Sequence, residues 1–141
     1  MNLGTKTRYA VMAMVEMSGR GGELPITLAE LAESQEINAP YLEQIFRKLK
    51  SGGLVKAVRG PGGGYVLSRS ADKIRISEIV EAVEESLKMT RCDAHKTSGC
   101  MTNKSRCLTH DLWEGLGKHI HDYLAAISLA DIYSKKNKMS V

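Results

Sequence analysis

The feature that most constrains the fold is a pair of closely spaced helix starts. Thr27 and Glu30 have the spacing of a capping box, in which a hydroxyl and a carboxylate each bind a backbone amide at the start of a helix. The helix that they begin must be short, because Asn38 is a good N-cap for a second helix and Pro40 is tolerated in its first turn. Two helices separated by a tight turn are therefore expected, the second spanning about residues 39–50.

The second helix has one apolar face and one polar face. Its apolar residues follow the spacing of a buried stripe, namely Leu42, Ile45, Phe46 and Leu49. The candidate DNA contacts on its other faces are Tyr41, Glu43, Gln44, Arg47 and Lys48, with Asn38 at its start. Taken alone, this pattern also fits an ordinary amphipathic helix with solvated charges. A short helix, a tight turn and a basic second helix together predict a helix-turn-helix, whose second helix enters the major groove of DNA.

The segment after this helix predicts a β-hairpin with a glycine-rich tip. Residues 54–58 and 65–68 read as strands, and the run from Arg59 to Gly64 between them makes a tight reversal. It is not a nucleotide-binding P-loop, because it lacks the closing Lys-Ser/Thr and joins two strands. Glycines such as Gly60 let the tip approach a sugar–phosphate backbone, and Arg59 is suited to a narrow minor groove. The predicted fold class is mainly α with a small β-hairpin wing, a winged helix-turn-helix.

Charge supports a polyanion-binding surface in the first half of the chain. Residues 1–76 hold 11 Lys and Arg against 7 Asp and Glu, which accounts for the whole net charge of +4. A first helix is expected over residues 5–18, with Lys6 and Arg8 at its start, where cations are unfavourable for the helix dipole. They are candidate phosphate contacts, although solvated charge explains them equally well. The expected partner of this half is double-stranded DNA, at promoter operators.

The pattern of the second half predicts a helix that follows the DNA-binding unit and a longer helix that pairs two copies of the chain. Residues 76–86 read as a helix capped by Ser77, with an acidic outer face that should lie away from DNA. Beyond His110, a longer helix carries an apolar seam formed by Trp113, Leu116, Ile120, Tyr123 and Ile127. A chain of this length has little core for the seam to cover, so a homodimer is expected, and packing within the chain is the alternative. Ser128 and Asp131 predict a last short helix to about Lys135.

All the cysteines of the chain fall in one short segment that ends in a histidine. The candidate metal ligands are Cys92, Cys100, Cys107 and His110. Cys107 and His110 are three residues apart, which at a helix start places both on one face. The residues between Cys92 and Cys107 read as loop, so the two parts can wrap one metal centre, with His95 as an alternative nitrogen.

Three chemistries compete for this segment. Zinc accepts three thiolates and one imidazole, but structural zinc sites usually have gaps of two to four residues, and the gaps here are of seven and six. An iron–sulfur cluster tolerates wide spacing and is favoured. A disulfide would leave one cysteine unpaired and is disfavoured in a reducing compartment. The chain is thus expected to divide into a DNA-binding domain (1–76), a linking helix with a cluster-binding loop (77–110), and a dimerisation helix with a tail (111–141).

Other classes of function find little support. An enzyme is not expected, because no Ser/His/Asp grouping or pair of carboxylates suggests a catalytic pocket. No apolar run approaches the ~20 residues that cross a bilayer, and no signal pattern begins the sequence, so no membrane partner and a cytoplasmic location are expected.

Several motifs resemble those of the IscR family of iron–sulfur cluster regulators. They are Arg8-Tyr-Ala-Val11, Tyr41-Leu-Glu-Gln44, Gly53-Leu-Val55, Arg59-Gly-Pro-Gly-Gly-Gly-Tyr65, Arg91-Cys92 and Cys107-Leu-Thr-His110. The resemblance covers nearly the whole chain. It implies a dimeric winged-helix transcription factor that carries a [2Fe–2S] cluster, with the cluster-assembly machinery as cluster donor, and that controls the genes for cluster assembly.

Carried over position by position, the resemblance implies that the cluster ligands are Cys92, Cys100, Cys107 and His110. It places Tyr41, Glu43 and Gln44 on the recognition helix and Arg59 on the wing. The cysteine loop is slightly longer in each gap than the family pattern. Asn38-Ala-Pro40 replaces a serine-rich helix start, which predicts a different operator preference. A related winged-helix regulator that senses nitric oxide, iron or redox state is the alternative.

Overall fold

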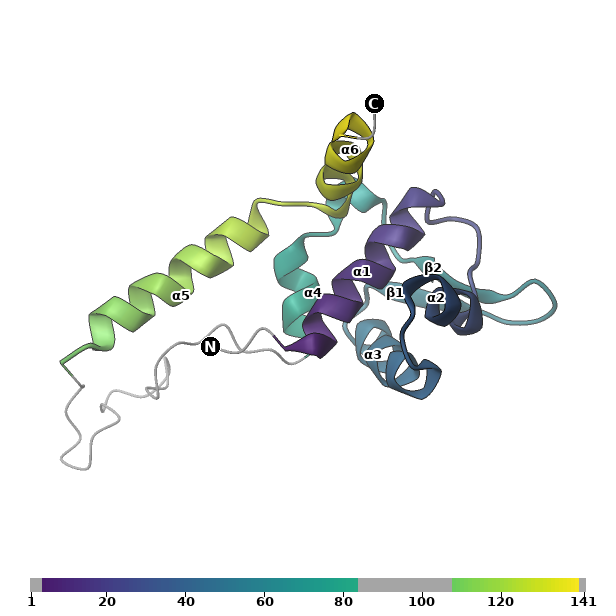
Figure 1. The fold of residues 1–141 in the computed structure, drawn as a ribbon, viewed down its shortest axis with the longest axis horizontal. Coiled ribbons are helices and arrows are strands. Elements are labelled where there is room, and N and C mark those ends of the chain that lie inside the picture. The colour runs from purple at the N-terminus through teal and green to yellow at the C-terminus, as the bar shows by residue number, and fades with distance from the viewer. Residues whose placement is uncertain (1–3, 84–107, 140–141) are drawn as a thin grey trace.

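The computed structural model describes residues 4–83 and 108–139, and within these ranges the chain is mainly helical (Figure 1). The elements are α1 (Thr5–Gly19), α2 (Leu28–Gln35), α3 (Ala39–Ser51), β1 (Val55–Val58), β2 (Gly64–Leu67), the 3₁₀ turn η1 (Ala71–Lys73), α4 (Ile76–Ala82), α5 (His110–Ala125) and α6 (Leu129–Met139). This order confirms the predicted class, mainly α with a two-stranded wing. Among the described helices, none is both long enough and apolar enough to cross a membrane.

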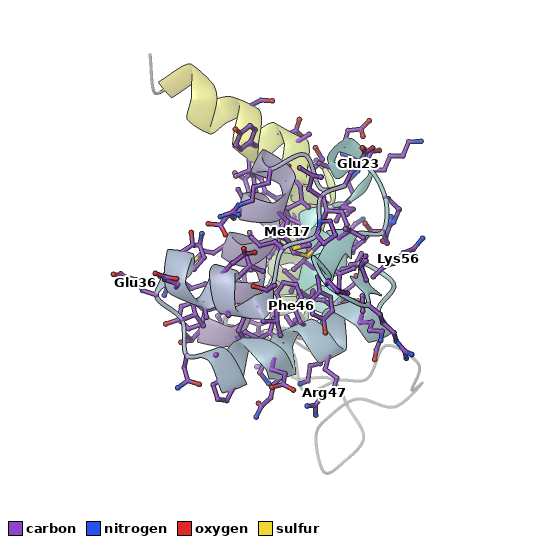
Figure 2. All side chains as sticks on the ribbon, turned by 90° about the vertical axis from the view of Figure 1, so that its right-hand side faces the viewer. Met17, Glu23, Glu36, Phe46, Arg47 and Lys56 are labelled. Carbon is purple, nitrogen blue, oxygen red and sulfur yellow. The ribbon has the colours of Figure 1, made fainter. Side chains whose placement is uncertain are left out.

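Helices α1, α2 and α3 share one core. The four apolar residues of the predicted α3 stripe are all fully buried in it, Phe46 being the largest. Helix α1 presents the small side chains of Ala10 and Ala13 to this core, and Met14 and Met17 fill the space around them. Figure 2 shows Met17 and Phe46 within the body of the molecule. The predicted amphipathic pattern of α3 therefore places its polar face outside, where a ligand can reach it.

The helix-turn-helix forms through the two predicted caps. The amide of Thr27 donates to Glu30 Oε2 at 3.0 Å, and the amide of Glu30 donates to Thr27 Oγ1 at 3.1 Å, which completes the capping box of α2. Helix α2 ends at Glu36 in the left-handed region, with φ of 54°. The side-chain oxygen of Asn38 then accepts from the amide of Tyr41 at 3.1 Å and caps α3. Local hydrogen bonds thus define the turn between the two helices.

The wing is an antiparallel pair of strands joined to the helix-turn-helix. Strands β1 and β2 pair with Val55 opposite Leu67 and Val58 opposite Gly64. Ile26, just before α2, adds a further rung: its amide donates to the carbonyl of Tyr65 at 3.0 Å and its carbonyl accepts from the amide of Tyr65 at 2.8 Å. This pairing attaches the base of the wing to the start of the helix-turn-helix.

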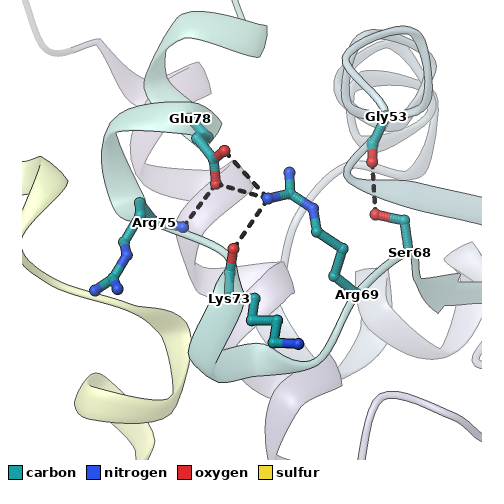
Figure 3. Close-up of polar contacts among 6 residues, drawn as sticks. All are labelled: Gly53, Ser68, Arg69, Lys73, Arg75 and Glu78. Atoms are coloured by element: carbon teal, nitrogen blue, oxygen red, sulfur yellow. Dashed lines mark hydrogen bonds and ion pairs between the residues drawn. The ribbon is translucent and has the colours of Figure 1, made fainter.

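A polar cluster fastens the segment after the wing to α4 (Figure 3). Arg69 Nη1 donates to the carbonyl of Lys73 at 2.9 Å and lies 3.2 Å from Glu78 Oε1. Glu78 Oε2 accepts from the amide of Arg75 at 2.8 Å. The prediction that Ser77 caps α4 was wrong, because Arg75 is the N-cap residue, the Glu78 carboxylate binds its amide, and Ser77 is buried in the first turn.

Helix α5 extends away from the body and approaches α4 near its own C-terminal end (Figure 1). There His121 Nε2 lies 3.3 Å from Glu81 Oε1, and Leu124 packs against the core. The chain then rejoins the body in a backbone clasp. The amide of Ile76 donates to the carbonyl of Ile127, and the amide of Leu129 donates to the carbonyl of Ile74, both at 3.0 Å.

Helix α6 begins at the predicted cap but runs further than expected. The amide of Ser128 donates to Asp131 Oδ2 at 2.9 Å, and the amide of Asp131 donates to Ser128 Oγ at 3.1 Å. The prediction that the helix ends near Lys135 was wrong, since α6 continues to Met139. It packs along α1, where a Cβ on Gly19 would lie 2.6 Å from the ring of Tyr133. This tertiary contact packs the first half of α6 against α1.

Candidate DNA-binding surface and metal ligand

The outer face of α3 carries the charged residues that were predicted to read DNA. Glu43, Gln44 and Arg47 are exposed, and Figure 2 shows Arg47 pointing away from the body while Phe46 is turned inward. Glu43 Oε1 and Arg47 Nη2 lie 3.7 Å apart, and 61% and 73% of their side chains are exposed. Ion pairs this exposed contribute little to stability, so both side chains can turn to a ligand at small cost.

Residues at the start of α3 take part in contacts that stabilise the fold, unlike the exposed Glu43 and Arg47. Asn38 uses its side-chain oxygen to cap the helix, which leaves its amide NH₂ as the part that can face DNA. Tyr41 is half-buried, and its ring meets that of Tyr9 edge to face with the centroids 5.9 Å apart. Lys48 is half-buried as well and is engaged by neighbouring groups. In these residues a structural role coexists with the predicted role in DNA binding.

The wing tip is exposed and closely packed on itself. Arg59 and Gly60 are exposed, and Gly60 has φ of 94°, a conformation that side chains rarely adopt. The amide of Gly63 donates to the carbonyl of Gly60 at 2.9 Å, and a Cβ on Gly63 would clash with the backbone oxygen of Val58 in β1. The ring of Tyr65 on β2 contacts Phe46 of α3 at a centroid distance of 5.0 Å. The wing therefore has a defined shape and a fixed attachment to α3.

An apolar groove lies between α1, α4 and the end of α5. It has a volume of about 380 Å³ and is lined by Thr7, Arg8, Val11, Met12, Ile76, Val80 and Leu124. Arg8 is exposed at its edge, whereas Lys6 is half-buried and engaged by neighbouring groups. The two predicted phosphate contacts of α1 thus differ in how freely they can reach DNA.

Helix α5 leaves large apolar side chains in solvent. Of these side chains, Leu112 is 62% exposed, Trp113 38%, Leu116 40% and Tyr123 68%. Ile120 is half-buried. Ile127, the last residue of the predicted seam, lies beyond the end of α5 and packs partly against the core of its own chain. The described structure thus leaves most of the seam without cover from its own chain.

His110 is the first residue of α5 and is buried, with 6% of its side chain exposed. Neither of its ring nitrogens makes a hydrogen bond within the described parts of the chain. Nε2 lies 3.0 Å from Oε2 of Glu114, a close approach without the alignment of a hydrogen bond. The other predicted ligands, Cys92, Cys100 and Cys107, and the alternative nitrogen of His95, lie outside the described residues.

Two contacts at these sites were missed by sequence reasoning. The edge-to-face packing of Tyr9 on Tyr41 joins helices far apart in sequence, and no local pattern announces it. The approach of Glu114 to His110 follows from i, i+4 spacing on a helix, and that signal was available once α5 was predicted. Within the described residues, His110, Asp111 and Glu114 are the one group of three potential ligands whose ligating atoms converge, all within 4.8 Å of one another.

Comparison with known proteins gives consistent results. Residues 3–135 match the model of the Rrf2 family, described as iron-dependent transcriptional regulators. The HTH-type transcriptional regulator IscR of Cereibacter sphaeroides is 46% identical over 99% of this chain and 90% of that protein. The protein of the same name from Xenorhabdus nematophila is 43% identical over 100% of this chain and 84% of that protein.

Solved structures show the same likeness in three dimensions. The structure of T. potens IscR has a TM-score of 0.81 at 33% identity, covering 100% of this chain and 92% of that one. CymR, the global cysteine regulator of B. subtilis, has a TM-score of 0.77 at 28% identity, covering 96% and 98%. The similarity thus spans both the DNA-binding half and α5.

Proposed function

This chain belongs to the Rrf2 family of transcriptional regulators, and we propose that it binds promoter operators as a homodimer and senses iron–sulfur status through a [2Fe–2S] cluster. The family and the relatives are regulators that bind DNA, not enzymes. The genes that we expect it to control are those for iron–sulfur cluster assembly. The metal part of this proposal rests on one observation: both ring nitrogens of His110 are buried and have no hydrogen bond within the described parts of the chain.

The imidazole of His110 fits an iron ligand. Buried polar atoms in proteins are nearly always hydrogen-bonded, yet both ring nitrogens of His110 are buried without such a bond in the described structure. An imidazole that follows Cys107 by three residues in the sequence can supply iron with a nitrogen ligand alongside thiolate ligands. The chemistry of the donor set, three cysteines and one histidine, suits an iron–sulfur centre with wide ligand spacing.

We assign Cys92, Cys100, Cys107 and His110 as the ligands. When bound, the cluster supplies one-electron chemistry and a sensitivity to iron supply and oxidants. His110 begins α5, so the residue that would grip the metal belongs to the same helix as the apolar seam. How firmly this end of α5 is held would therefore bias the separation of two paired DNA-binding units.

The DNA contacts would come from α3, the wing and the start of α1. We place Tyr41, Gln44 and Arg47 at base edges or phosphates of the major groove, where a second helix of this motif docks. Lys48 lies on the same helix and Asn38 caps it. Arg59 and Gly60 would meet the minor groove, and Lys6 and Arg8 would meet phosphates. Glu43 can accept from cytosine but repels phosphate, so its release from Arg47 would add selectivity.

A second copy of this chain is the expected cover for the apolar face of α5. Large exposed apolar side chains gathered on one helix mark an interaction surface, and α5 extends beyond the body of its own chain (Figure 1). The groove beside Val11, Met12 and Val80 offers a matching apolar surface next to the end of α5. A two-fold dimer would place two recognition helices on successive half-sites.

The metal part is tested on protein purified without air. We expect a coloured protein with iron and sulfide in equal amounts, and an operator affinity that differs between the loaded and metal-free forms at some promoters. His110→Ala should lose the cluster, whereas His119→Ala, at an exposed position of the same helix, should keep it. A colourless, iron-free protein that stays indifferent to added iron and sulfide would refute the proposal. Bound zinc, or thiols alone, would favour a related regulator with another signal.

The DNA part is tested through the dependence of affinity on salt. Removing a side chain that binds one phosphate should lower the slope of log affinity against log salt by about 1. Arg59→Ala on the wing should show this smaller slope. Arg20→Ala removes the same charge at the far end of α1, where Arg20 pairs with Glu16 at 3.9 Å, and should leave the slope unchanged. Equal slopes for the two variants would contradict the assignment of the wing.

A further inference from the structure

The pairing of His110 with Glu114 points beyond the ligand set itself. Glu114 stands one helical turn after His110, and its Oε2 lies 3.0 Å from Nε2 of the ring. The imidazole is 6% exposed and the carboxylate side chain 63% exposed. The carboxylate therefore reaches from solvent to one edge of a buried ring, while Nδ1 on the other edge is buried and has no hydrogen bond within the described parts of the chain.

Such a carboxylate has a known effect on a metal-binding histidine. A ligating imidazole usually donates its second ring N–H to a carboxylate or carbonyl, which fixes the tautomer and makes the ring a better donor. Residues i and i+4 of a helix keep a constant separation, so the contact is built into α5. The present approach is short but poorly aligned, and the side chain of Glu114, which is 63% exposed, has room to rotate.

Accepting the proposed function as its basis, we propose that Glu114 is a positioning residue for the cluster. Its carboxylate accepts the Nε2–H of His110, holds the ring in one tautomer and leaves Nδ1 as the nitrogen that iron binds. Glu114 is not itself a ligand in this arrangement. Its negative charge strengthens the imidazole as a donor and so favours the oxidised cluster and slows its loss.

The test compares three variants of the full chain, purified without air. Glu114→Ala removes the acceptor, and Glu114→Gln keeps an oxygen acceptor without the charge. Asp122→Asn removes one negative charge from an exposed position on the same helix and serves as the matched control. The readouts are the rate of cluster loss to a chelator, the midpoint potential, the visible spectrum, and the circular dichroism and melting temperature of the metal-free proteins.

We expect Glu114→Ala to lose its cluster about 10- to 100-fold faster than the parent protein, with a more positive potential and an altered spectrum. The rate of cluster loss and the potential of Glu114→Gln should lie between those of Glu114→Ala and the parent, and those of Asp122→Asn should match the parent. The metal-free variants should melt alike, because Glu114 is largely exposed. If Glu114→Ala proved unstable, the potential of Glu114→Gln would decide.

Two results would overturn the inference. Equal cluster lifetime and potential in Glu114→Ala and the parent would show that Glu114 does not act on the ring. A longer lifetime in Glu114→Ala would show that the carboxylate competes with iron for the imidazole. In both cases the parent protein holds its cluster, and only the role of Glu114 fails. A parent protein that takes up no iron and sulfide would instead refute the proposed function.

Discussion

Helices α3 and α5 have similar apolar patterns but bury them differently. In α3, the stripe that contains Phe46 and Leu49 is fully buried against α1 and α2 of the same chain. In α5, Trp113, Leu116 and Tyr123 remain 38% to 68% exposed. The periodicity of a helix shows that one face needs cover. It does not show whether that cover comes from the same chain or from another.

The largest expected effect comes from truncating a buried side chain of α3. Phe46→Ala should lower the free energy of unfolding by about 3–5 kcal/mol, because it opens a cavity beneath α3 and removes the ring against which Tyr65 packs. Urea denaturation at fixed protein concentration measures the loss. A change below about 1 kcal/mol would mean that the core tolerates the void by collapsing around it.

A second substitution tests the exposed side. Leu116→Glu should weaken self-association by at least about 2 kcal/mol, or roughly 30-fold, because a charge would enter the proposed interface. Lys118→Glu places the same residue on the other side of α5 and serves as the control. Sedimentation measured over a range of concentrations reports the change, and circular dichroism checks the fold. If Leu116→Glu still dimerised like the control, α5 would be covered in some other way.

The junction between the two regions should be sensitive to the cap of α6. Ser128→Ala removes the hydroxyl that accepts from the amide of Asp131, and losing such a cap typically costs about 1 kcal/mol. The loss should appear in the urea denaturation midpoint while the recognition helix, and with it DNA binding by the folded protein, stays unchanged. Ser51→Ala, which removes a hydroxyl from the exposed last residue of α3, is the comparison for stability. Equal stabilities of the two variants would mean that the clasp at residues 127–129 holds without the cap.

The smallest expected effect concerns the polar cluster around Glu78, which fastens the segment after the wing to α4. Burial raises the pKa of Glu78, but the hydrogen bonds from the Arg75 amide and Arg69, together with the positive charge of both arginines, lower its pKa further than burial raises it. A carboxyl group whose pKa is lower in the folded state stabilises the fold above its unfolded pKa and loses that contribution as the pH falls through the folded value.

Glu78→Gln should therefore slightly lower the free energy of unfolding at pH 7. Between pH 7 and about pH 3, the stability of this variant should fall less than that of the parent protein. Because 36% of the Glu78 side chain is exposed, solvent screens the interaction and the effect should be smaller than that of the α6 cap. Urea denaturation across this pH range measures it. Parallel pH profiles for the two proteins would show that the cluster does not titrate with folding.

Apart from the cap of α4, which was misplaced at Ser77, sequence reasoning succeeded where the signals were local. The capping box of Thr27 and Glu30, the cap of Asn38 and the glycine-rich reversal after Arg59 each lie within a few residues, and all of them form as predicted. It failed where distant parts of the chain decide the outcome. The rung between Ile26 and Tyr65, for example, joins residues far apart in sequence that show no pairing pattern.

The end of α6 was missed as well. Helix α6 continues to Met139, and its contact with α1, where Gly19 makes room for Tyr133, cannot be read from residues 128–139 alone. At the candidate metal site, the sequence singled out His110, and the structure adds its burial and its approach to Glu114. The roles of the three cysteines and the pairing of α5 stay predictions.

The clasp at residues 74–76 and 127–129 also bears on how relatives of this molecule can diversify. The backbone at Ile74 and Ile76 is hydrogen-bonded to the backbone at Ile127 and Leu129, so the part of the chain between Ile76 and Ile127 begins and ends at one place. Insertions and exchanges are best tolerated where the flanking framework is held independently of them. Evolution can therefore replace the sensing segment between these two hydrogen-bonded sites while it keeps the same DNA-binding half.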